Sequence, residues 1–200
     1  RSHAAILTNL IADVMKESCI EFAQLSGVAV SKGPGSYTGL RIGVSTAKGI
    51  CFALNIPLIA IDTLAIIADM ALENQHSENE DVLYIPMIDA RRMEVYSAVY
   101  NKDLTKVRDV EANIIDNESF KEFNNKALVF CGNGSDKCKD VISISDSIFL
   151  PNIFPSAKFM TKQAHQKFIN QEFEDVAYFE PYYLKDFIAT IPKNKVLGER

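Results

Sequence analysis

The sequence predicts an α/β protein built from two lobes. Three observations support this prediction: strands and helices alternate through residues 4–72, a polar stretch over 73–81 interrupts the pattern, and each side of it holds a strand that runs into a Gly-x-Gly-Ser turn. Alternating strands and helices are typical of a parallel sheet covered by helices. We therefore expect an N-terminal lobe over 1–80, a C-terminal lobe over 81–185 and a basic tail over 186–200.

The expected N-terminal lobe begins with an amphipathic helix. Short apolar runs at 28–30 and 56–61 then predict two buried strands, because parallel strands covered on both faces read as continuous hydrophobic segments. The helix is expected over 4–16, where apolar residues recur at helical spacing and form a single stripe of Leu7, Leu10, Ile11 and Val14.

A second helix is expected over 39–54, between the two strands. Asn55 follows it as a stop signal. Asp62 or Thr63 then caps a third helix over 64–72. The apolar face of the second helix consists of Leu40, Val44, Ala47, Cys51 and Leu54.

The expected C-terminal lobe has a different pattern. Residues 82–100 read as two strands joined at 89–92. The second alternates between two faces, with Val95, Ser97 and Val99 on one and Tyr96, Ala98 and Tyr100 on the other. Residues 126–136 form a further strand that enters a glycine turn, and 155–171 read as a helix. The two Gly-x-Gly-Ser turns are a faint internal repeat of the kind expected from related lobes.

Composition and charge exclude several classes of protein. Hydrophobic residues make up 48% of the chain, as in globular proteins. No apolar run reaches the roughly 18 residues of a membrane span, and the start lacks the pattern of a signal peptide, so we expect a cytoplasmic protein without membrane contact. The net charge of −5 argues against independent binding of nucleic acid, which needs a basic face. The four cysteines are expected to be reduced thiols.

A glycine-rich loop joins the first strand to the second helix, in the segment SKGPGSYTGLRIG at 31–43. Glycines before a helix expose backbone N–H groups, so phosphate binding is one interpretation. The spacing fits neither a P-loop nor a dinucleotide fingerprint. The alternative is a tight turn in which Ser36 or Thr38 caps the helix. A nucleophilic role for Ser36 lacks the surrounding Gly-x-Ser-x-Gly pattern.

Two carboxylates follow apolar strands and are candidates for chemistry. Asp62 and Asp89 stand where split α/β enzymes often place catalytic groups, but Asp62 is equally a helix cap and Asp89 a turn residue, and we favour these structural roles. No His, Asp or Glu pair has the spacing of a metal site. We therefore assign no catalytic residue and no metal ligand.

Glycines inside the second helix indicate a close contact. Gly43 and Gly49 each cost roughly 1 kcal/mol relative to alanine, and the approach of another helix, strand or ligand would offset that cost. Together with the wide stripe of the first helix, they suggest more apolar helix surface than one small lobe needs to bury.

Four segments of the chain resemble the TsaB (YeaZ) family, the dimerisation subunit of the bacterial machinery that makes threonylcarbamoyladenosine in tRNA. They are, in order, AVSKGPGSYTGLRIGVSTAKGICFALNIPLIAIDTL, IDARRMEVYSAVY, CGNGSDK and FEPYYLKDF. The resemblance implies the actin-like ATPase (ASKHA) fold, with two RNase H-like lobes. Family members also begin with a strand pair that carries an Ile-Asp-Thr-Ser/Thr loop, and we expect the N-terminal lobe over 1–80 to lack these strands.

The resemblance further implies a non-catalytic scaffold that binds and activates the transferase TsaD. TsaE, a small ATPase, joins the pair; the subunit alone forms homodimers; tRNA is contacted only indirectly. No cofactor is implied for this chain, and any ATP at the complex interface would be held mainly by the partners. The alternatives are an independent ASKHA-type ATPase or an M22-like peptidase.

Two sets of residues follow from the resemblance. The implied partner interface is formed by the helices 4–16 and 39–54, so that Leu10→Glu or Val44→Arg should disrupt dimerisation before unfolding the lobe. Its residues are Leu7, Leu10, Ile11, Val14, Leu40, Gly43, Val44 and Ala47. The implied remnant of a nucleotide cleft comprises Gly33, Pro34, Gly35, Ser36, Thr38, Asp62 and Asp89.

Overall fold

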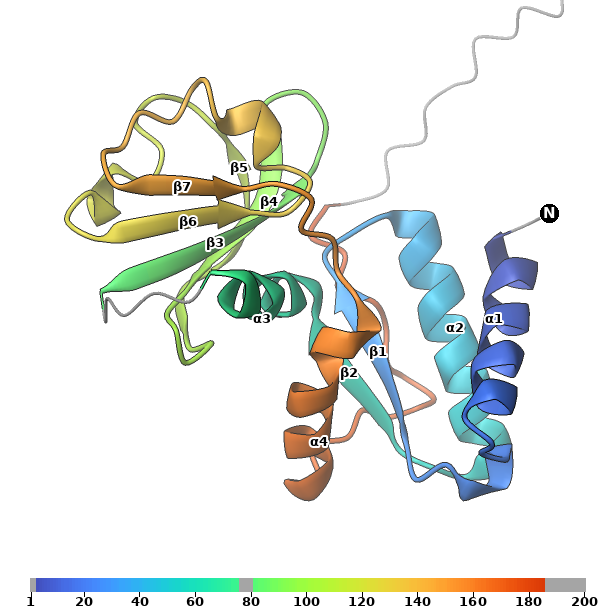
Figure 1. Ribbon diagram of the computed structural model, residues 1–200. Coiled ribbons are helices and arrows are strands. Elements are labelled where there is room, and N and C mark those ends of the chain that lie inside the picture. The colour runs from blue at the N-terminus through green and yellow to red at the C-terminus, as the bar shows by residue number, and fades with distance from the viewer. Residues whose placement is uncertain (1–2, 76–80, 186–200) are drawn as a thin grey trace, which may run out of the picture.

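A computed structural model describes residues 3–75 and 81–185 (Figure 1). The helices of eight or more residues are α1 (His3–Glu17), α2 (Tyr37–Leu54), α3 (Thr63–Asn74) and α4 (Thr161–Ile169). The strands are β1 (Val28–Gly33), β2 (Leu58–Asp62), β3 (Val82–Asp89), β4 (Glu94–Tyr100), β5 (Lys106–Ile114), β6 (Ala127–Cys131) and β7 (Ser147–Leu150). Each expected helix and strand is present, with shifted ends, and β5 and β7 are additional.

The first sheet contains two parallel strands, β1 and β2, with helices on both faces. α2 and α1 lie on one side and α4 on the other (Figure 1). The side chains of β2 alternate accordingly: Leu58 packs with Ala47 and Cys51 of α2, whereas Ile59 and Ile61 pack in a cluster that also holds Phe168 of α4. Coverage of both faces explains why this strand is an unbroken apolar run.

The second sheet contains five strands in the order β5-β4-β3-β6-β7. β3 pairs antiparallel with β4 and parallel with β6. One face packs against α3 through a cluster that includes Leu64, Ile67 and Tyr84. The other face is covered by the connections after β5 and β6, which contribute Phe120 and Cys138 to a second cluster. α3 therefore lies where the two sheets adjoin (Figure 1).

The end of the described chain returns to the first sheet. Glu174 N donates to Leu58 O at 2.9 Å, and Tyr182 N donates to Lys32 O at 2.7 Å. We call residues 175–185 the C-terminal strap. The range 81–185 was expected to form the second lobe, but α4 and the strap within it pack on the first lobe. These contacts join residues that lie far apart in the sequence. The expected basic tail over 186–200 lies outside the described residues.

Lys48 of α2 fixes the strap to the helix. Its Nζ donates to Ala177 O at 3.1 Å and to Phe179 O at 2.9 Å. We expect Lys48→Met to release the strap at a cost of about 1–3 kcal/mol, the usual range for a hydrogen bond to a charged group. Hydrogen exchange of the Val176–Phe179 amides should accelerate. Lys139→Met, which removes an exposed lysine from the second lobe, serves as control, and equal exchange in both variants would contradict the clamp.

Candidate interaction surface on the paired helices

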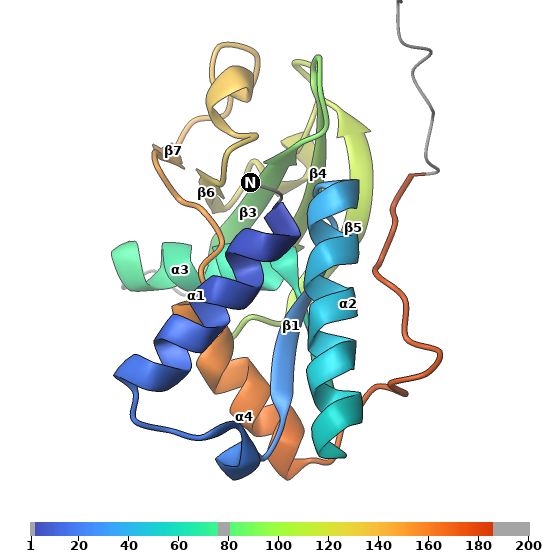
Figure 2. The ribbon, with the colours of Figure 1, turned by 90° about the vertical axis from the view of Figure 1, so that its right-hand side faces the viewer.

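α1 lies against α2 on the outside of the first lobe (Figure 2). Leu7 and Ile11 are half-buried, as expected for residues at this helix contact. Leu10 and Val14 remain 55% and 59% exposed, and Ile6 is also exposed. The stripe predicted from the sequence is therefore split. One part anchors α1 to α2, and the other part faces solvent.

α2 buries the stripe that the sequence analysis assigned to a partner. Leu40, Val44 and Ala47 are only 9%, 3% and 5% exposed, because this face of α2 packs on β1 and β2. A Cβ added at Gly43 would meet Val30 of β1 at 4.0 Å. Leu40, Val44 and Ala47 therefore belong to the interior of the lobe, which corrects their assignment to an interface, and Gly43 beside them is half-buried. A helix that covers a sheet needs the same periodic stripe as a helix that binds a partner, so the pattern alone did not distinguish them.

The opposite side of α2 is exposed and partly apolar. Phe52 is 83% exposed, and a Cβ added at Gly49 would have no atom within 4 Å. Phe52 was not predicted as an interface residue, although its position next to Cys51 places it off the buried stripe. We define the outer face as the exposed apolar residues of α1 and α2 together with the open glycine of α2: Ile6, Leu10, Val14, Gly49, Phe52 and Ala53.

Two shallow apolar grooves flank the exposed ridge of α2, and Gly49 lines both. The first, of about 450 Å³, lies between the helices and is lined by Thr8, Phe22, Thr46, Gly49, Ile50, Ala53 and Leu54. The second, of about 650 Å³, lies between α2 and the strap and is lined by Lys48, Gly49, Phe52, Asp175, Val176 and Ala177. The side chains of a partner helix can pack into the grooves on either side of such a ridge.

The glycine loop is occupied by the chain itself. Gly33 has a φ of +113°, and a Cβ there would lie 2.7 Å from Tyr182 O of the strap. The close approach that requires this glycine is therefore made by the strap. Ser36 is the N-cap of α2, and its Oγ accepts from Gly39 N at 3.4 Å, as the capping interpretation predicted. Pro34 is buried and Gly35 is half-buried in the loop, whereas Thr38 lies in the first turn of α2.

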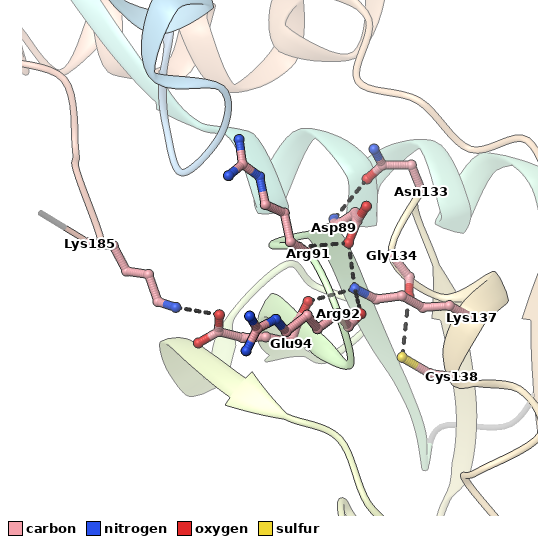
Figure 3. A network of polar contacts seen from close by, with 9 residues as sticks. All are labelled: Asp89, Arg91, Arg92, Glu94, Asn133, Gly134, Lys137, Cys138 and Lys185. Carbon is pink, nitrogen blue, oxygen red and sulfur yellow. Dashed lines mark hydrogen bonds and ion pairs between the residues drawn. The ribbon is translucent and has the colours of Figure 1, made fainter. Parts of the chain in front are cut away.

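Asp62 and Asp89 both have structural partners. Asp62 Oδ1 accepts from Leu64 N at 3.0 Å and so caps α3, and its Oδ2 lies 3.6 Å from Lys106 Nζ. Asp89 accepts from the Arg91 backbone N–H at 2.9 Å and pairs with Lys137 (Figure 3). The hydrogen bond from Lys137 lowers the pKa of Asp89 and keeps it ionised. The favoured cap and turn roles are thus what the structure shows.

The two Gly-x-Gly-Ser turns are packed differently. In the second turn, a Cβ at Gly132 would lie 2.3 Å from Met87 O, so β3 itself fills the space. Cys138 Sγ donates to Gly134 O at 3.3 Å, and burial raises the pKa of this thiol.

Across the two described ranges, no three His, Cys, Asp or Glu side chains gather as metal ligands. None of the helices in these ranges combines the length and the hydrophobicity that a membrane span requires.

Comparison with known proteins places the chain in a family. The family described as TsaD, tRNA N6-adenosine threonylcarbamoyltransferase, matches residues 1–193. The tRNA threonylcarbamoyladenosine biosynthesis protein TsaB of Escherichia coli is 27% identical over 94% of this chain and 83% of its own length. A tRNA N6-adenosine threonylcarbamoyltransferase of Rhodopseudomonas palustris is 45% identical, but over 32% of this chain and 18% of its own length.

Solved structures confirm the fold. YeaZ from Pseudomonas aeruginosa superposes with a TM-score of 0.77 at 23% identity, covering 92% of this chain and 86% of that one. Another solved structure, described as an uncharacterized protein with similarity to peptidase YeaZ from Pseudomonas aeruginosa, gives a TM-score of 0.81 at 23% identity over 92% of this chain and 85% of its own. The chain therefore belongs to the family of TsaD, tRNA N6-adenosine threonylcarbamoyltransferase, has its actin-like ATPase fold, and resembles TsaB (YeaZ) over most of its length.

Proposed function

We propose that this chain is a non-catalytic scaffold subunit that binds and activates the transferase TsaD, which modifies the tRNA adenosine next to the anticodon. The outer face of α1 and α2 is the observation that carries the proposal. It presents Leu10, Val14 and Phe52 to solvent, and two apolar grooves border it. Large side chains left this exposed are typical of interaction sites when they gather on one surface.

The shape of the outer face suits a partner helix. Gly49 and Ala53 are the small residues of the ridge and allow a close approach, while Phe52 stands beside them as an aromatic anchor. We propose that TsaD docks here in the complex and that a second copy of the chain uses overlapping surface when TsaD is absent. TsaE joins the pair as a further partner.

The engaged carboxylates support a non-catalytic role. Asp62 is committed to the cap of α3 and to Lys106, and Asp89 to Lys137 and its own turn. These contacts give both carboxylates structural roles, in a helix cap and in a turn. We propose that the chain needs no cofactor of its own and that any nucleotide in the complex is held mainly by the partners.

We expect the isolated chain to hydrolyse neither ATP nor peptides above background. The reason is that both candidate carboxylates are already paired or used as caps. Release of phosphate from ATP and cleavage of a fluorogenic peptide library would be measured with the wild type, Asp62→Asn and Asp89→Asn. If both variants show the same turnover as the wild type, the activity comes from a contaminant. If either substitution removes the turnover, the chain is an enzyme.

The proposal is tested by reconstitution with TsaD from the same cell. TsaD, TsaE, ATP and an unmodified tRNA transcript would be assayed for threonylcarbamoyladenosine with and without this chain. Modification that depends on the chain, together with a TsaD–chain complex in sedimentation, is the expected result. Full modification without the chain, or a failure of the two proteins to associate, would overturn the proposed function.

A further inference from the structure

The hairpin between β3 and β4 carries two adjacent arginines in an unusual conformation. Arg91 and Arg92 have φ values of +74° and +49°, both in the left-handed region. Ala90 N donates to Glu94 O at 3.0 Å and closes the hairpin around them. Both arginines are exposed. The tip of this hairpin is thus a hydrogen-bonded turn that displays two cationic side chains.

The acidic residues beside the arginines are already neutralised by lysines. Lys137 pairs with Asp89 and also donates to Arg92 O and Glu94 O, at 2.6 and 2.7 Å (Figure 3). Lys185 of the strap pairs with the Glu94 carboxylate. Neither guanidinium has an ion-pair or hydrogen-bond partner within the described residues, and Arg91 projects away from the Asp89–Lys137 contact (Figure 3). The two guanidinium groups are therefore exposed and free of direct ion pairs among the described residues, although Asp89 lies near enough to feel the charge of Arg91.

Arginine is a poor choice for this backbone. Left-handed φ values favour glycine and asparagine, and hairpin loops that need them usually carry Asn-Gly or a similar pair. Side chains with a Cβ are strained there, and such strain is concentrated at functional sites. Arg91 and Arg92 occupy positions that glycine or asparagine would suit better. A role of the arginines beyond the turn would account for this choice.

In contrast to the purely indirect contact that the resemblance implied, we propose that Arg91 and Arg92 bind phosphate groups of an RNA, the tRNA on which the proposed complex acts; this inference rests on the proposed function. Guanidinium groups match phosphate oxygens in bidentate geometry. An RNA fits the hairpin better than a protein does, since none of the exposed large hydrophobic side chains lies on residues 89–94. Protein interfaces need an apolar centre, and the hairpin itself supplies none.

The contact adds to binding that partners supply. The chain carries a net charge of −5, so two arginines do not hold RNA by themselves at physiological salt. Within the complex, each phosphate contact contributes to the salt dependence of binding. Loss of one contact lowers the slope of log affinity against log salt by about one.

The test compares variants of the hairpin in the TsaD complex. Arg91→Asn/Arg92→Asn removes both charges and relieves the backbone, and Arg91→Lys/Arg92→Lys keeps the charges. Binding of an unmodified tRNA transcript would be measured across a salt series. The asparagine variant should bind roughly tenfold or more weakly, with a slope lower by about one to two, and unfold at the wild-type temperature or above. The lysine variant should retain the slope.

The outcomes are separable. Sedimentation of each variant with TsaD tests the proposed function independently of RNA. If TsaD does not bind even the wild type, the proposed function fails, and the arginines are tested by binding of the chain alone at low salt. Unchanged affinity and slope in the asparagine variant would overturn the inference. The inference would also be overturned if the asparagine variant bound ATP more weakly but bound tRNA as tightly as the wild type does.

Discussion

Replacing Leu10 and Val14 with glutamate is expected to abolish both TsaD binding and self-association of the chain while leaving it folded. Both side chains are more than half exposed on α1, so the substitutions cost little in the isolated protein. In an interface, each glutamate would lose its hydration against apolar surface. The loss should reach about 2–4 kcal/mol, or roughly 30- to 1000-fold in affinity.

Sedimentation with and without TsaD measures this effect, and thermal unfolding confirms that the variant is folded. Ile114→Glu is the matched control, because Ile114 is an apolar residue 74% exposed on β5 of the second lobe. The control should associate as the wild type does. Equal binding by the control and the double variant would mean that TsaD docks away from the outer face.

Val44→Arg is expected to unfold the first lobe. Val44 is 3% exposed on the face of α2 that packs on β1 and β2, so a guanidinium there would be buried against the sheet. An unpaired charge at such a site costs about 3–5 kcal/mol, a large part of the stability of a typical domain. The sequence-based expectation, that this change would break a dimer before unfolding the lobe, is reversed by the burial of Val44.

Chemical denaturation of Val44→Arg checks the expectation, with Ser45→Arg as control. Ser45 is the next residue on α2 and is exposed, so the same arginine there meets solvent. We expect the midpoint of unfolding to fall sharply for the first variant and to change little for the second. A Val44→Arg protein as stable as the wild type would mean that α2 can rotate or lift from the sheet.

The sequence predicted those parts of the fold that depend on local patterns. The apolar run of β2 and the stripe of α2 each reflect one continuous buried surface, and Ser36 was correctly proposed as a cap. β5 was missed because most of its residues are exposed or half-buried at the edge of the sheet, so its apolar signal is weak. β7 is too short, at four residues, to show a period.

The candidate site was predicted less well because it depends on contacts across the chain. Tertiary packing decides whether an apolar helical stripe faces a sheet or a partner. Val44 and Leu10 both lie on such stripes, so the sequence pattern does not distinguish them. The pairing of Lys137 with Asp89 spans 48 positions, and the strap reaches Lys48 over more than a hundred. No local pattern reports such distances, although the exposed Phe52 off the buried stripe was a usable signal.

The return of α4 and the strap to the first sheet also affects how the chain folds during translation. A ribosome releases α1 to β2 early, but Ile59 and Ile61 stay uncovered on the face of the sheet that Phe159 and Phe168 later protect. The second lobe is contiguous and can fold before that happens. The nascent first lobe therefore exposes apolar surface until α4 emerges. During this interval it can bind chaperones or associate prematurely with another chain.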